Sequence, residues 1–176
     1  MDRVQTHKTY GLITALVMIV VGTALYLANL SFESWAQWIV YIPFLGGLIL
    51  NAQAFSKANQ GYITFGQAFS SCFKATAIIT LIMLAWAILS IFIFPDMKER
   101  ALERAQLQME EQGMAEEQIE MGIEMTRKGF WLFVLGGTLL GYMFFGAIFS
   151  LIAAATAKRK VGGPPPQMDV MNQPTA

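Results

Sequence analysis

An uncharged apolar run of twenty residues, Ala75–Phe94, constrains the fold of this chain more than any other feature. At ~1.5 Å of rise per residue, a helix of this length is ~30 Å long, which matches the hydrocarbon core of a bilayer. Eleven of the twenty residues are Leu, Ile or Phe. At roughly −0.3 to −0.6 kcal/mol each, they favour insertion by roughly 3–7 kcal/mol. The sequence therefore predicts an integral membrane protein.

The composition supports a single membrane domain with few groups suited to catalysis. The 176 residues are 55% hydrophobic and 14% charged, whereas an average soluble domain is about 25% charged. The formal net charge is zero, so no nucleic-acid partner is expected. Cys72 and His7 are the only residues of their types, which argues against an intrachain disulfide, a Cys-based metal cluster and a His-based catalytic centre.

Three more apolar segments bring the predicted number of membrane helices to four, and the expected fold class is all-α. The first apolar run is longer than the roughly 7–15 residues of a signal-peptide core, so it is expected to be retained. Thr64 and Gln67 have the spacing of a capping box, which predicts that the third helix begins near Phe65. The spans are expected at about 10–30, 35–55, 67–94 and 130–157.

The one large polar segment, 96–128, is predicted to form an amphipathic helical hairpin outside the bilayer. Apolar residues recur at helical spacing on both sides of Gly113, which should separate two helical arms. Methionine side chains adapt to protein partners, but they also suit the packing of one arm on the other. The candidate interaction residues are Met109, Met114, Ile119 and Met121. The Pro-rich segment 161–176 is predicted to be a disordered cytoplasmic tail.

The distribution of Lys and Arg predicts that both termini face the cytoplasm. Seven basic residues then lie inside, including Lys158, Arg159 and Lys160 directly after the last span. Five lie in the hairpin, and the first outer loop has none. The positive-inside rule counts Lys and Arg alone, so the hairpin is expected on the outer face despite its nine acids.

A few residues within the spans are candidates for function. Asn51, Gln53 and Lys74 could line a polar notch, although the favoured interpretation of Lys74 is that it extends its ammonium group to the headgroups. Gly137 and Gly141 form a GxxxG motif, which permits close helix packing within the monomer or between copies in a homo-oligomer.

No combination of residues indicates a catalytic centre, a cofactor site or a metal site. The sequence has no HExxH motif, no P-loop and no GxGxxG motif. The clustered hairpin acids lack the spacing and central glycine of a calcium-binding EF-hand loop, so a solvated acidic face is the favoured interpretation.

Several segments resemble a known family. They are Tyr10–Thr14, Gly61–Phe69, Phe94–Asp96, Met109–Met114, Glu117–Glu120 and Ser150–Ala155. Together they resemble the domain-of-unknown-function family 4199, small four-span membrane proteins of Bacteroidetes-type bacteria, over roughly residues 10–158. The resemblance implies a bacterial inner-membrane location and four spans, and it implies no activity.

Two functional hypotheses follow, with a weaker third. The first is a non-enzymatic accessory subunit that uses the hairpin to contact a protein partner. The second is a small oligomeric transporter or channel with a path near Asn51, Gln53 and Lys74. A lipid-modifying enzyme is the third, and it has no acid or histidine within the spans to support it.

Overall fold

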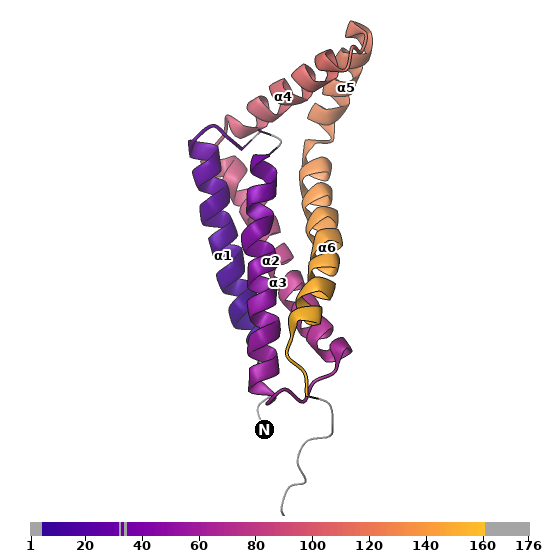
Figure 1. Cartoon of the computed structure of the whole chain (residues 1–176). Coiled ribbons are helices and arrows are strands. Elements are labelled where there is room, and N and C mark those ends of the chain that lie inside the picture. The colour runs from indigo at the N-terminus through magenta and orange to yellow at the C-terminus, as the bar shows by residue number, and fades with distance from the viewer. Residues whose placement is uncertain (1–4, 32, 34, 161–176) are drawn as a thin grey trace, which may run out of the picture.

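The computed structural model describes residues 5–31, 33 and 35–160, and six helices make up nearly all of that part (Figure 1). No strand occurs among the described residues, so the predicted all-α class is confirmed. The segment 161–176, predicted to be disordered, lies outside them. The helices are α1 (Thr6–Leu27), α2 (Ala36–Ala58), α3 (Phe65–Ile93), α4 (Met97–Glu111), α5 (Glu116–Lys128) and α6 (Phe130–Thr156).

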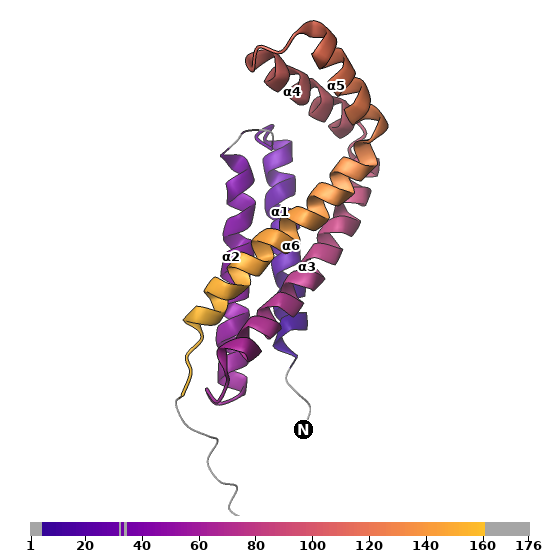
Figure 2. The same cartoon turned by 90° about the vertical axis from the view of Figure 1, so that its right-hand side faces the viewer.

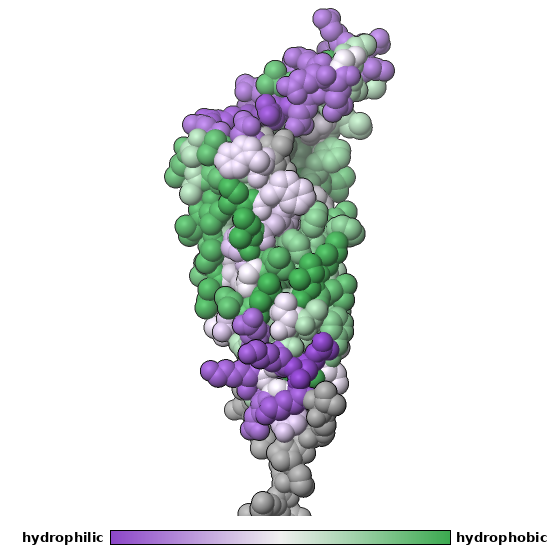
Figure 3. All heavy atoms as spheres, in the orientation of Figure 1, coloured by the Kyte–Doolittle hydropathy of each residue, from purple (hydrophilic) through white to green (hydrophobic). Residues whose placement is uncertain are grey.

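Helices α1, α2, α3 and α6 form a bundle, and each is long and apolar enough to cross a membrane. Figure 3 shows an apolar belt across the visible face of the bundle, with polar surfaces above and below it. Phe92 and Leu132 are 73% and 76% exposed, an arrangement that suits contact with lipid rather than water. The chain is therefore a four-span, all-α membrane protein, as its sequence predicts.

The helix boundaries follow local hydrogen bonding. The Thr64 hydroxyl accepts from the Gln67 amide at 3.2 Å, and the Gln67 side chain accepts from the Thr64 amide at 2.9 Å. This capping box begins α3 at Phe65, as predicted. Helix α1 begins at Thr6, before the apolar run, because helical backbone hydrogen bonding extends through the polar residues that precede that run.

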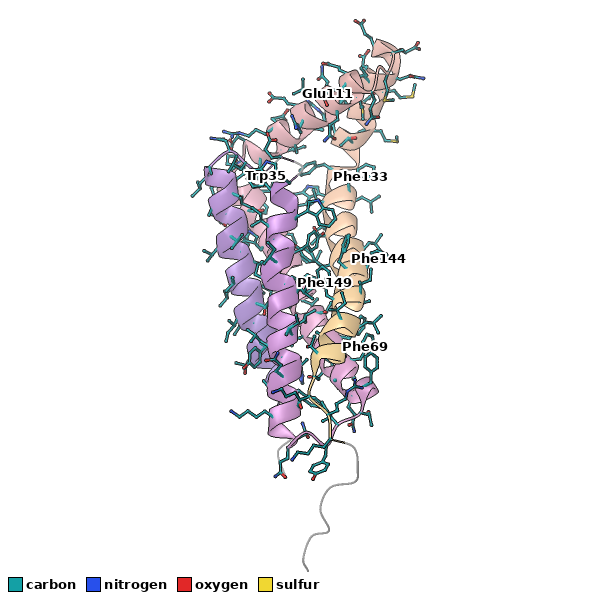
Figure 4. All side chains as sticks on the ribbon, in the orientation of Figure 1. Trp35, Phe69, Glu111, Phe133, Phe144 and Phe149 are labelled. Carbon is teal, nitrogen blue, oxygen red and sulfur yellow. The ribbon has the colours of Figure 1, made fainter. Side chains whose placement is uncertain are left out.

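Tight helix contacts in the bundle depend on two glycines. A Cβ at Gly47 of α2 would overlap the hydroxyl of Thr14 in α1, and one at Gly146 of α6 would overlap the side chain of Thr76 in α3. Phe44 of α2 is fully buried, and its ring lies 5.4 Å from that of Phe149 on α6. Figure 4 labels Phe149. Glycine thus lets neighbouring backbones approach closely, as is common between membrane helices.

Helices α4 and α5 form the predicted hairpin and extend beyond one end of the bundle (Figure 2). Gly113 joins them with φ at +71°, a left-handed conformation that glycine adopts without a Cβ clash. Gly129 alone separates α5 from α6. We call the opposite end of the bundle, where α1 begins and α6 ends, the basal end.

Candidate functional site: the hairpin and the basal pockets

The base of the hairpin is fixed to the bundle by a small polar cluster. The Tyr26 hydroxyl of α1 donates to Asp96 at 3.0 Å, and Asp96 pairs with Arg100 at 2.8 Å. Arg100 also donates to the side-chain oxygen of Asn29 at 2.7 Å. The first turn of α4 is therefore attached to the end of α1. The i,i+4 spacing of Asp96 and Arg100 favours such a pair.

Beyond that base, the two arms pack mainly on each other and not on the bundle. Leu102 and Ile119 are 4% and 8% exposed, and the Met109 side chain lies against Gly122 of α5. Met109 and Ile119 therefore pack within the hairpin. Of the four candidate interaction residues, only Met114 and Met121 present substantial surface, at 37% and 65% exposure.

A groove of about 820 Å³ lies along the hairpin, and its lining combines acids with apolar side chains. Arg127 is its one basic residue. The lining comprises Gln106, Glu110, Met114, Glu116, Ile119, Glu120, Ile123, Glu124 and Arg127. Four carboxylates against one guanidinium give the groove a negative balance.

Most of the groove acids have no ion-pair partner within the described residues. Glu124 pairs with Lys128 at 2.6 Å, whereas Arg127 pairs outside the groove with Glu99 at 3.4 Å. Glu110 accepts a hydrogen bond from Gln106 at 2.9 Å. Among the described residues no cluster of three or more acidic, histidine or cysteine side chains could hold a metal ion. The groove instead offers dispersed negative charge beside apolar surface.

Inside the bundle, Asn51 of α2 is fully buried and contacts polar side chains of α3. Its amide nitrogen donates to the Ser71 hydroxyl at 3.2 Å and to the Cys72 sulfur at 3.6 Å, while its side-chain oxygen has no partner among the described residues. Ser71 also lines a pocket of about 650 Å³ at the basal end, together with Lys74 and His7. The structure thus brings Asn51 and Lys74 to neighbouring positions around Ser71.

Gln53 does not join them. It is exposed and lines a different basal pocket, together with Lys57 and the segment after α6. Residues two apart in a helix point about 200° apart, so Asn51 and Gln53 lie on different faces of α2. The structure therefore places Lys74 and Gln53 at different basal pockets, and a polar path near all three residues stays a prediction.

Gly137 and Gly141 have no described atom within 4 Å of where a Cβ would lie, whereas Gly146 packs closely on α3. The intrachain small-residue contact of α6 therefore lies at Gly146 and Ser150, beyond the GxxxG motif. Contact with another copy through that motif stays a prediction.

Sequence reasoning missed the hydroxyl groups that continue the interior polar cluster along α3. Thr76 and Thr80 are buried, and the Thr76 hydroxyl lies 3.3 Å from that of Ser150 on α6. Thr80 donates to the carbonyl of Thr76 at 2.9 Å. The i+4 repeat of Cys72, Thr76 and Thr80 was the available signal, since residues four apart share a helix face.

Comparison with known proteins gives a family and no activity. No significant match was found among curated proteins or among solved structures. The family model described as "Protein of unknown function (DUF4199)" matches residues 9–159, which include all four bundle helices from Thr9 onward, the hairpin and the basal residues Lys158 and Arg159. The chain therefore belongs to the DUF4199 family, as its sequence motifs indicate.

Proposed function

We propose that this protein is a non-enzymatic accessory subunit of a bacterial inner membrane, and that its hairpin binds a cationic, amphipathic segment of a protein partner. The observation that carries the proposal is the acidic groove on a hairpin that extends beyond the bundle. The proposal places both termini in the cytoplasm and the hairpin on the outer face, because basic residues gather at the basal end.

The hairpin has apolar surface that its own packing does not use. Leu107, Met121 and Met125 are 48%, 65% and 62% exposed. Isolated helices of α4 and α5 length, 15 and 13 residues, are marginal in water, and those under ~12–15 residues depend on packing for stability. An apolar face on a partner would cover the methionines and stabilise both arms.

Charge indicates which partner fits. Glu116 and Glu120 in the groove have no ion pair among the described residues, and anionic headgroups would be repelled by them. A segment that carries Lys or Arg beside apolar residues would satisfy both features of the groove. Electrostatic attraction of this kind accelerates association and weakens as salt rises.

A matched pair of double variants tests the proposal. Glu116→Gln with Glu120→Gln removes two charges from the groove, whereas Glu111→Gln with Glu117→Gln removes two hairpin charges outside it. After mild detergent extraction, the amount of co-purified partner is measured by quantitative mass spectrometry. We expect the groove variant to lose most of the partner and the control to retain it.

Two results would contradict the proposal. Equal partner yields from both double variants would exclude the groove as the binding surface. Replacement of residues 99–125 by a Gly/Ser linker leaves the insertion energy of the spans in place. A partner that still co-purified with this shortened chain would show that the hairpin is a spacer, and the contact would then be sought around Gly137 and Gly141.

A small oligomeric transporter or channel is the second candidate, and the unpartnered side-chain oxygen of buried Asn51 favours it. Polar groups inside a membrane are costly and often functional. The bundle is filled beyond this point, however, because Leu48, Phe44 and Met18 are fully buried toward the hairpin end. A transport path near Asn51 and Lys74 would therefore require these helices to separate.

A further inference from the structure

A second basal pocket, of about 680 Å³, lies where α2 ends and the chain leaves α6. Its lining is rich in cations and in donors of hydrogen bonds. The charged members are Lys57, Lys158, Arg159 and Lys160, and the amide members include Gln53 and Gln60.

The chain holds these cations in place through its backbone and through aromatic rings. The Ser56 hydroxyl donates to the carbonyl of Lys158, and the Lys160 amide donates to the carbonyl of Gly61 at 2.9 Å. The Lys160 ammonium lies 5.1 Å from the centre of the Tyr62 ring. The segment after α6 is therefore docked on the turn that follows α2, so the pocket is organised before any ligand arrives.

The positive charge of the pocket is not neutralised by the described part of the chain. Every acid in that part is Glu33 or lies within 96–124, at the hairpin end. The C-termini of α2 and α6 contribute about half a negative charge each, against four cations in the lining. The two helix dipoles together thus neutralise only about one of the four positive charges.

We propose that this pocket binds the phosphate group of an anionic ligand, and specifically the headgroup of an anionic phospholipid. Lys and Arg donate charge-assisted hydrogen bonds to phosphate oxygens, and side-chain amides add neutral donors. The pocket lies at the basal edge of the apolar belt, the level at which basic pockets between membrane helices meet lipid headgroups. Free phosphate shares this chemistry, so the experiment separates the two sources.

Binding is measured by calorimetry on the full chain in a neutral detergent. The probes are dihexanoyl phosphatidylglycerol, dihexanoyl phosphatidylcholine and inorganic phosphate. We expect phosphatidylglycerol to bind at least tenfold more tightly than phosphatidylcholine. Tighter binding of phosphatidylglycerol than of inorganic phosphate assigns the site to a lipid headgroup, and the reverse order assigns it to soluble phosphate. If the unmodified protein bound both lipids with equal affinity, the proposal would be overturned.

A matched pair of variants then locates the site. Lys57→Gln with Lys158→Gln removes two pocket cations and leaves the contacts of Lys160 with Tyr62 and of Arg159 with Phe65 intact. Lys8→Gln with Lys74→Gln removes two basal cations outside the pocket. At about fivefold per cation near a membrane surface, the pocket variant should lose about 25-fold in affinity. The control should stay within about twofold, because neither of its lysines lines the pocket. Equal losses from both variants would attribute binding to general basal charge and overturn the proposal.

Discussion

Replacing Gly47 with alanine should destabilise the bundle, whereas the same change at the adjacent Gly46 should not. In the structure, a Cβ at Gly47 would overlap the Thr14 hydroxyl and would lie 2.7 Å and 2.8 Å from two Thr14 carbons. Among the described residues, no atom other than those of α2's own nearby backbone lies within 4 Å of a Cβ at Gly46. Both glycines are inside α2, so the gain in helix propensity is common to the two variants.

The expected difference follows from overpacking. Forcing extra atoms into a packed contact costs about 1–3 kcal/mol, because side chains or helices must shift. The Gly47→Ala variant should therefore be less stable than Gly46→Ala by that amount. The assay is unfolding of the purified protein by increasing mole fractions of sodium dodecyl sulfate in mixed micelles, followed by circular dichroism.

A double variant tests the cause. Thr14→Ala removes two of the three atoms that the new methyl group would meet, so combining it with Gly47→Ala should restore most of the lost stability. A coupling of at least ~0.5 kcal/mol between the two positions is expected for residues in direct contact. Equal stability of Gly46→Ala and Gly47→Ala would refute the close approach of α1 and α2 at this point.

Three further predictions concern orientation, the basal lysine and the hairpin base. In a cysteine-free background, Gln112→Cys should react with an impermeant maleimide in intact spheroplasts and Asn59→Cys should not; the opposite pattern would reverse the proposed orientation. Lys74→Gln and Lys74→Arg should both stay within ~0.5 kcal/mol of the parent stability, as exposed substitutions usually do, and a cellular defect confined to Lys74→Gln would favour a functional cation. Tyr26→Phe removes the 3.0 Å hydrogen bond to Asp96, so amide exchange in the first turn of α4 should accelerate by several-fold; unchanged exchange would show that this bond does not hold the hairpin base.

The spans and the hairpin could be predicted because their signals are local. Uninterrupted apolar runs define the bundle helices, and the Thr64–Gln67 spacing located the start of α3. Gly113 separates the hairpin arms for an equally local reason, because it takes a left-handed conformation between α4 and α5.

Which residues come together at each candidate site depends on which helices become neighbours, and the sequence alone gives little information on helix neighbours. A Cβ at Gly146 would meet α3 whereas one at Gly141 would meet no described side chain within 4 Å, and nothing in the local pattern of small residues separates the two. The division of Asn51 from Gln53 could have been seen, since helical geometry places residues two apart on different faces. The clustering of Lys57 with Lys158 joins segments about a hundred residues apart, which no local pattern reports.

The length of α4 limits how far the hairpin can reach from the bilayer. Its 15 residues rise ~22 Å at 1.5 Å each, and any tilt shortens that height. Glu111 ends this helix, near the outer turn of the hairpin (Figure 4). Under the proposed function, a partner must therefore bring its binding segment into a layer about 20 Å deep above the membrane surface. Other membrane proteins and proteins bound to the membrane surface hold their segments at this height, whereas freely diffusing proteins do not.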